Sequence, residues 1–328
     1  MRTIVNPYRG TGFKTGFEAV PAPSVDAAAP RALLDRCPSH GVTPMVQALA
    51  LHIKDERGRM GLGSFKALGA AYVIAHEAQL GSLEGRTYIT ASAGNHGMSV
   101  AAGAKVFGAK AVIYLAKTVP SDFADRLREK GADVVIEGDD YEASMAGAQA
   151  AAAANGWTLL SDSSWDGYFD LPHRLMEGYL AMAAECTEQM DAPTHIFLQA
   201  GVGGLAGACA ALFRDVWGDE PHITVVEPEF APAIFESIQA GGFAVSTGPV
   251  SDMGRLDCKE ASLIALKGLS RDTDSITLIT EEEAFATLPK LAALGLASST
   301  SGSAGITAAL LSDLPEGAKV LCILSEGE

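Results

Sequence analysis

Short, continuously apolar runs alternate with longer amphipathic segments along this chain after residue 40. Runs of the first kind predict strands, at Arg86–Ala91, Ala111–Leu115, Asp133–Ile136, Thr158–Leu160, Thr194–Gln199, His222–Glu227 and Lys319–Leu324. Segments of the second kind have helical spacing, at Lys66–Leu80, Asn95–Phe107, Ser121–Lys130, Tyr141–Asn155, Leu171–Glu188, Gly203–Val216 and Glu281–Leu294.

Strands that are apolar on both faces and separated by helices are typical of parallel β-α-β units covered on both sides. The fold class predicted from this pattern is therefore α/β. Residues 1–40 show only a weak pattern punctuated by Pro and Gly, and we predict them to be irregular. A length of 328 residues with 48% hydrophobic content is enough for two domains or one large one.

Composition and charge narrow the possible partners. The net charge of −16 argues against binding to nucleic acid or an anionic membrane, because either polyanion would be repelled. Five widely spaced cysteines without a C-x-x-C pair indicate neither a disulfide framework nor a zinc site, and we predict no metal. The N-terminus lacks a signal-peptide pattern and no run of about 18 apolar residues occurs, so we expect a cytoplasmic protein.

A lysine follows a glycine-containing loop in Gly61-Leu-Gly-Ser-Phe-Lys66-Ala-Leu-Gly69. A cation is unfavourable at the start of a helix, and we expect this position to depress the pKa of Lys66. A Schiff-base or general-base lysine requires such a depressed pKa. The alternative is an ordinary lysine that extends along the helix to reach solvent.

A loop of small residues follows the strand predicted at Arg86–Ala91, in Thr90-Ala-Ser-Ala-Gly-Asn95-His96-Gly97. Backbone N–H groups in such a loop could bind an anion, for example a carboxylate. Asn95 could also be a simple N-cap, and His96 a capping or packing residue.

A second glycine loop, Gln199-Ala-Gly201-Val-Gly203-Gly204-Leu-Ala-Gly207, lies between a predicted strand and a predicted helix. By the same logic it could cradle a phosphate. It lacks both the Walker lysine and the dinucleotide spacing G-x-G-x-x-G. Close helix–strand packing is the alternative reason for its glycines.

Together, a lysine, a carboxylate loop and a phosphate loop at the turns of one parallel sheet describe a pyridoxal 5′-phosphate site. The three motifs, in this order, resemble the fold-type II pyridoxal-phosphate enzymes, such as threonine dehydratase, serine racemase and cysteine synthase. Within that group the chain most resembles the diaminopropionate ammonia-lyase family. The resemblance covers nearly everything after residue 40, including Trp165-Asp-Gly-Tyr168, Glu177-Gly-Tyr179 and Ser325-Glu-Gly327.

The resemblance implies a role for each matching position. Lys66 would carry the cofactor as a Schiff base and move the substrate proton, and Asn95 would hydrogen-bond the cofactor's ring hydroxyl. Ser301, with Thr300 as the alternative, would face the pyridine nitrogen. The substrate loop would comprise Ser92, Ala93, Gly94, Asn95 and His96, and the phosphate loop Gly201, Val202, Gly203, Gly204 and Leu205. A side chain at Gly203 or Gly204 is expected to block the anion, so Gly203→Val should lower cofactor affinity far more than stability.

The resemblance also implies an architecture like that of the tryptophan synthase β subunit, with parallel sheets flanked by helices. We expect residues 1–84 and 166–328 to form a large cofactor domain and residues 85–165 a small domain. A homodimer is the expected assembly. One position departs from the ammonia-lyase pattern: that family has an aspartate before its Gly-Asn-His-Gly run, and this chain has Ala93.

We therefore expect a lyase that eliminates the β-substituent of a small L-amino acid and yields a 2-keto acid and ammonia. One alternative is a serine, threonine or 3-hydroxyaspartate dehydratase that uses the same residues. A pyridoxal-phosphate-binding protein without catalysis is another, although a carrier would not need the carboxylate loop. A nucleotide-binding domain is disfavoured by the missing glycine fingerprint.

Overall fold

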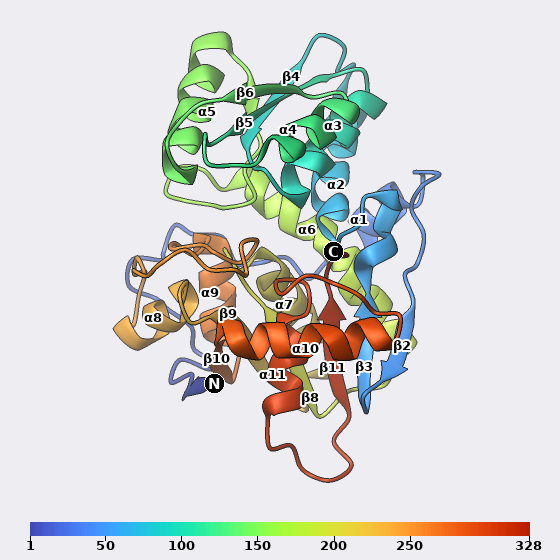
Figure 1. Ribbon diagram of the computed structural model, residues 1–328, viewed down its shortest axis with the longest axis vertical. Helices are drawn as coiled ribbons and strands as arrows, with labels where there is room; N and C mark the ends of the chain where they lie inside the picture. Colours follow the sequence, from blue (N-terminus) through green and yellow to red (C-terminus); the bar gives the residue numbers. More distant parts are fainter.

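The computed structural model describes residues 1–328, whose strands form two sheets (Figure 1). The larger sheet has the strand order β1-β10-β9-β8-β11-β3-β2, and the smaller sheet has the order β6-β5-β4-β7. The strands are β1 (Arg2–Val5), β2 (Met45–Ala48), β3 (Leu51–Asp55), β4 (Thr87–Ala91), β5 (Lys110–Leu115), β6 (Asp133–Ile136), β7 (Thr158–Leu159), β8 (His195–Gln199), β9 (His222–Pro228), β10 (Ser275–Ile279) and β11 (Val320–Leu324).

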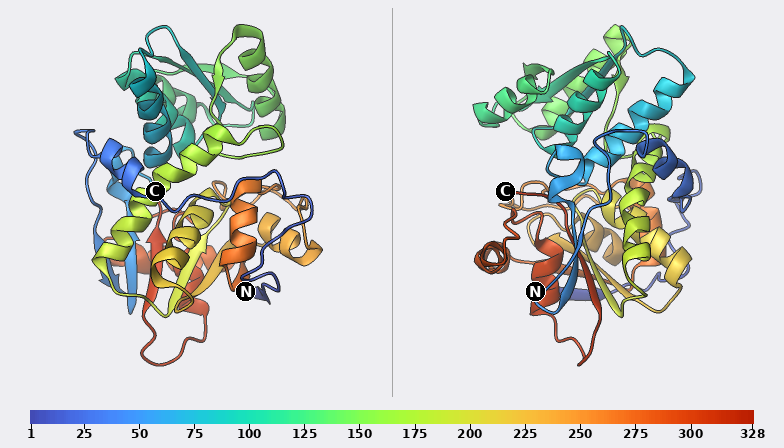
Figure 2. Two further views of the ribbon diagram at one scale, coloured as in Figure 1. Left: turned by 180° about the vertical axis from the view of Figure 1, so that it is seen from behind. Right: turned by 90° about the vertical axis from the view of Figure 1, so that its right-hand side faces the viewer.

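Helices cover both faces of both sheets (Figure 2). They are α1 (Ala28–Leu34), α2 (Lys66–Leu80), α3 (Asn95–Val106), α4 (Ser121–Glu129), α5 (Tyr141–Asn155), α6 (Asp170–Gln189), α7 (Gly204–Trp217), α8 (Ala233–Ala240), α9 (Leu263–Asp272), α10 (Glu281–Ala293) and α11 (Ala304–Leu311), with a 3₁₀ helix η1 (Glu56–Gly61). One apolar core runs from Ile113 of the smaller sheet through Leu68 of α2 and Leu180 of α6 to Ile196 of the larger sheet. Smaller cores lie beneath α11 and α5.

The predicted α/β class with parallel strands is confirmed. All pairs in the smaller sheet are parallel, as are the central pairs of the larger sheet. Only the edge strands β1 and β2 pair antiparallel to their neighbours. The strands of the smaller sheet fall within residues 87–159, and the domain boundaries at 84/85 and 165/166 stay a prediction. None of the helices combines the length and apolarity needed to cross a membrane.

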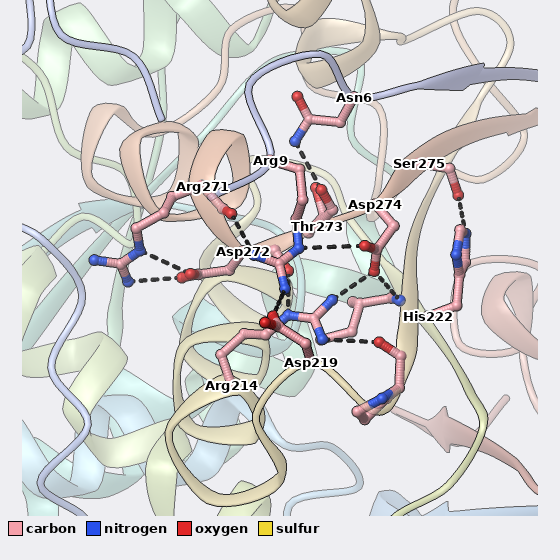
Figure 3. A network of polar contacts seen from close by, with 12 residues as sticks. Asn6, Arg9, Arg214, Asp219, His222, Arg271, Asp272, Thr273, Asp274 and Ser275 are labelled. Carbon is pink, nitrogen blue, oxygen red and sulfur yellow. Dashed lines mark hydrogen bonds and ion pairs between the residues drawn. The ribbon is translucent and has the colours of Figure 1, made fainter. Parts of the chain in front are cut away.

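The prediction that residues 1–40 are irregular is wrong for β1 and α1. A polar network accounts for the position of β1 (Figure 3). Asn6 donates to the carbonyl of Thr273 at 2.7 Å, and Arg9 donates to Asp274 at 3.2 Å. Arg214 also binds Asp274, at 2.5 Å. Strand β1 is mostly exposed and has too few apolar positions to be recognised by periodicity. Polar contacts with a segment far along the chain help to hold it in place instead.

Helices α2 and α6 cross at two glycines, and this crossing fixes the start of α2. A Cβ on Gly178 would lie 2.6 Å from the carbonyl oxygen of Leu68, and a Cβ on Gly69 would lie 2.8 Å from Leu175. Real side chains cannot occupy such distances, so the two backbones touch only because both positions are glycine. The close approach brings Lys66 of α2 and Tyr179 of α6 into one region.

A fully buried ionic cluster holds the segment that leads into α2. Arg59 donates to Glu56 at 2.7 Å and to Glu185 of α6 at 2.7 Å, and Lys54 donates to Glu185 at 2.6 Å. Burial alone would raise the pKa of Glu185, but Arg59 and Lys54 outweigh it and the pKa is lowered. Leaving one of these charges unpaired is costly. The cluster therefore constrains η1, which contains a left-handed turn at Met60 (φ +51°) just before Lys66.

Candidate active site

The three predicted motifs all lie at the carboxyl ends of strands, where ligands bind in open α/β sheets. Lys66 begins α2, Asn95 begins α3 directly after β4, and Gly201 follows β8. Backbone pairing brings the first of these to the end of β11: Phe65 N–H donates to Ser325 C=O at 3.1 Å, and Gly327 N–H donates to Gly63 C=O at 3.1 Å. Figure 1 shows the C-terminus between the part of the molecule with β4, β5 and β6 and the part with β8 to β11.

Lys66 is paired with a carboxylate that sequence reasoning did not single out. Its Nζ lies 2.5 Å from Oδ2 of Asp162, in the segment after β7, and the two side chains are 20% and 17% exposed. Burial alone would lower the pKa of Lys66, but Asp162 outweighs it and the pKa is raised. The expected depression of the lysine pKa is therefore wrong for this state. The helix dipole is weaker than a carboxylate in hydrogen-bond contact.

The predicted carboxylate loop is folded tightly against the first turn of α3. The Ser92 hydroxyl accepts a hydrogen bond from Gly94 N–H at 3.3 Å. A Cβ on Gly97 would lie 2.3 Å from the Ser92 carbonyl oxygen, so glycine at 97 permits the loop's path. His96 is buried and its Nε2 is 2.7 Å from the carbonyl of Leu160, which makes it the donor. Burial lowers the pKa of His96, so its neutral ring ties α3 to the segment after β7.

Asn95 belongs to a polar cluster that extends to the end of the chain. Its Nδ2 donates to Glu326, which also accepts a hydrogen bond from the Ser299 hydroxyl. Arg255 pairs with Glu326 at 3.0 Å, and a Cβ on Gly94 would lie 4.0 Å from the Arg255 side chain. Burial raises the pKa of Glu326, and Arg255 only partly offsets this effect. The cluster places one guanidinium beside the carboxylate loop.

The start of α7 has the properties of an anion site. Its N-cap, Gly203, is in the left-handed conformation and has no side chain to cap the helix. No protein acceptor is found for the N–H groups of Gly204, Leu205 and Ala206, whereas Gly207 N–H already donates to Gly203 C=O. Free amides at a helix N-terminus attract phosphate. The residues present therefore fit the phosphate of the implied cofactor.

A side chain at position 203 was expected to block the approach of the anion, and this reason for the glycine is wrong. A Cβ there would point into the core, 3.1 Å from Ala265 of α9 and 3.2 Å from Ile234 of α8. Its φ of +94° also disfavours any other residue. We now predict that Gly203→Val lowers the stability of the cofactor-free protein, by about 1–3 kcal/mol from overpacking.

Urea unfolding of the cofactor-free protein measures this loss. Gly156→Val, at another left-handed glycine with open space around its Cβ, is the control for backbone strain alone. An unchanged unfolding midpoint for Gly203→Val would contradict the packing argument.

The serine-rich segment before α11 distinguishes the two predicted hydroxyls. Ser301 Oγ accepts from Arg255 N–H at 3.2 Å, and no acceptor for its own proton is found. The Thr300 hydroxyl already donates to Asp252 C=O at 3.1 Å. An unprotonated pyridine nitrogen needs a donor, and Ser301 has one free. This observation favours Ser301 over Thr300.

Sequence reasoning missed Asp162, Arg255 and Glu326 as members of this site. No local pattern marks Asp162, which lies in a polar turn, or Arg255, which lies in an irregular segment. Glu326 lies within the Ser325-Glu-Gly327 match, but no role was assigned to it. Each is recognised only by its partner on another element. The roles assigned to the predicted site residues stay predictions.

Comparison with known proteins gives a consistent set of relatives. The family model described as "Pyridoxal-phosphate dependent enzyme" matches residues 37–326. Diaminopropionate ammonia-lyase of Salmonella typhimurium is 34% identical over 260 residues, which are 70% of this chain and 64% of that enzyme, less than two thirds of its length. Human L-serine dehydratase/L-threonine deaminase is 28% identical over 265 residues, 77% of each chain. The Escherichia coli diaminopropionate ammonia lyase structure superimposes with a TM-score of 0.88 at 27% identity, covering 100% of this chain and 94% of that one.

Proposed function

Since the chain belongs to the family of pyridoxal-phosphate dependent enzymes, we propose that it catalyses β-elimination from a small L-amino acid to give a 2-keto acid and ammonia. The first substrate to test is L-2,3-diaminopropionate. The observation that carries the proposal is the contact between Lys66 and Asp162 at the carboxyl ends of the strands. The contact puts a titratable amine and a carboxylate side by side in a partly accessible position. The loop of Ser92 to Asn95 and the start of α7 are the proposed sites for the substrate's carboxylate and the cofactor's phosphate.

Lys66 would hold the cofactor, which when bound would supply the electron sink for the negative charge that develops at Cα. When its amine is free, Lys66 would take the Cα proton of the substrate. Asp162 holds Nζ at a fixed position and stabilises its protonated form, since a carboxylate in contact favours the cation. The protein thereby controls where the proton is held after its removal.

The substrate's α-carboxylate is assigned to the loop of Ser92 to Asn95. Backbone N–H groups at the start of α3 supply hydrogen bonds there, and the Arg255 guanidinium beside Gly94 supplies positive charge. Glu326 fixes Arg255 and Asn95 relative to each other through its two oxygens. This arrangement orients the substrate with its Cα toward Lys66.

The Asp162 carboxylate favours an ammonium over a hydroxyl as the leaving group. While the Lys66 amine is neutral, the negative charge of Asp162 beside it attracts a cationic β-substituent. A neutral β-hydroxyl has no such attraction. An amine also departs far better when protonated, and the carboxylate stabilises that form. This difference supports diaminopropionate over the serine, threonine and 3-hydroxyaspartate alternatives.

We predict that keto-acid release from L-2,3-diaminopropionate exceeds release from L-serine and L-threonine. Asp162→Asn should lower kcat/KM for diaminopropionate about tenfold more than for L-serine, the loss of one charge-assisted interaction. Steady-state assays of keto-acid formation measure both. Asp166→Asn, on the same segment and exposed, is the matched control. Fastest turnover of a hydroxy-amino acid by the unmodified protein would favour the dehydratase alternative instead.

A further inference from the structure

The hydroxyl of Tyr179 is buried and has no hydrogen-bond partner. Its side chain has no exposed surface, and its ring packs edge-on against Phe65 with centroids 4.9 Å apart. Buried tyrosine hydroxyls are nearly always hydrogen-bonded, because an unpaired one loses its contact with water and gains nothing. The missing partner of this hydroxyl therefore points to a ligand.

The surroundings of the ring show where the hydroxyl points. A Cβ on Gly69 of α2 would lie 2.8 Å from Cε1 of Tyr179, and a Cβ on Gly204 of α7 would lie 3.5 Å from Cε2. These two ring carbons flank the carbon that bears the hydroxyl. The Nζ of Lys66 lies 6.0 Å from the ring centroid. The hydroxyl end of the ring thus lies between Lys66 and the first residue of α7.

Gly204, the first residue of α7, begins the run of backbone N–H groups that have no acceptor. Helix α7 has 14 residues, and its opening N–H groups, from Gly204 to Ala206, have no acceptor in the protein. The helix dipole adds positive potential at the same point. The unpaired phenol therefore lies beside the residue that begins the unpaired amides, and one anion bound there would accept from both kinds of donor.

We propose that the Tyr179 hydroxyl donates a hydrogen bond to the phosphate of the cofactor and completes the cradle formed by the start of α7. The inference rests on the proposed site, in which Lys66 carries the cofactor. Burial raises the pKa of Tyr179 more than the neighbouring Lys66 amine lowers it, so the phenol keeps its proton and stays a donor. The close α2–α6 crossing at Gly69 and Gly178 then also sets the distance between Lys66 and the hydroxyl that donates to the phosphate.

The test compares two ligands that differ only in the phosphate. Cofactor-free protein is titrated with pyridoxal 5′-phosphate and with pyridoxal, and binding is followed by absorbance. Tyr179→Phe should raise the Kd for the phosphate ester about tenfold or more, the loss of one hydrogen bond to a charged group. Its Kd for pyridoxal should be unchanged. Tyr114→Phe, a buried tyrosine on β5 of the smaller sheet, should change neither.

Three outcomes would overturn the inference. An unchanged Kd for the phosphate ester means that the hydroxyl does not contact the phosphate. Equal losses for both ligands mean that the ring serves packing alone, and a lower kcat with unchanged affinity means that it serves proton transfer at Lys66. Failure of the unmodified protein to bind either ligand would instead contradict the proposed site itself.

A crystal structure of the unmodified holoenzyme tests the same contact without a substitution. The Tyr179 Oη should lie within about 3.0 Å of a phosphate oxygen, the range of O–H···O hydrogen bonds. A phosphate bound away from the start of α7, or a Tyr179 hydroxyl that contacts another group, overturns the inference.

Discussion

Lys66→Ala is expected to abolish both the yellow absorbance of the bound cofactor and all turnover. The reaction needs an amine at this position that can form an imine with the cofactor and later take the Cα proton. No other lysine offers one. The buried Lys54 donates to the Thr43 carbonyl, Glu185 and Gln189, so its amine is held in the ionic cluster. The Lys66→Ala protein would keep the substrate loop and the anion site but would lack the amine that forms the imine and takes the proton.

Lys66→Arg separates the charge of Lys66 from its chemistry. An arginine keeps a cation opposite Asp162 but cannot form the imine, so it should preserve stability and still lack colour and turnover. Lys290→Ala, an exposed lysine on α10, is the matched control and should keep both. Absorbance spectra and keto-acid release are the measurements. A Lys66→Ala protein that kept colour and turnover would contradict the assignment of this lysine.

Many elements whose hydrophobic pattern is local were predicted from the sequence, although the apolar strand β10 and the helices α9 and α11 were not. The helices at Lys66–Leu80 and Tyr141–Asn155 and the strand at Asp133–Ile136 begin and end in the structure where the pattern places them. Strand β3 was missed because its Leu-His-Ile-Lys-Asp sequence mixes apolar and charged residues. Its lysine is buried only because Glu185, from α6, neutralises it. Local periodicity carries no information about such a partner.

In the candidate site, too, features with a local sequence pattern were predicted and features that depend on distant partners were not. The three motifs were visible because small residues at strand-to-helix turns have a local signature. The pKa of Lys66 was predicted in the wrong direction because the helix dipole is a local feature, whereas the stronger Asp162 carboxylate comes from a segment far along the chain. Glycine at 203 was assigned to anion binding because the sequence does not show Ala265 and Ile234 packed against it.

The stereochemistry of turnover follows from the position of the available bases. A D-amino acid held by the same carboxylate loop presents its Cα hydrogen on the face opposite Lys66, so its removal needs a second base there. Ala93, in that loop, has no proton acceptor. The hydroxyl of Ser92 has no useful basicity near neutral pH and accepts from Gly94 N–H. Of the nearby carboxylates, Asp162 is paired with Lys66, and Glu326 is held by Arg255, Ser299 and Asn95.

We therefore expect D-isomers to react at least about 10²-fold more slowly than L-isomers, the low end of what a positioned general base contributes. Ala93→Asp should restore part of the D-activity, because it places a carboxylate in the loop without altering Lys66. Ala93→Asn is the matched control, since it has nearly the same shape and no basicity. Keto-acid release from D- and L-2,3-diaminopropionate measures the ratio in all three proteins. Comparable rates for the two isomers in the unmodified enzyme would refute the argument, and equal D-activity in the two variants would show that shape, not basicity, decides the outcome.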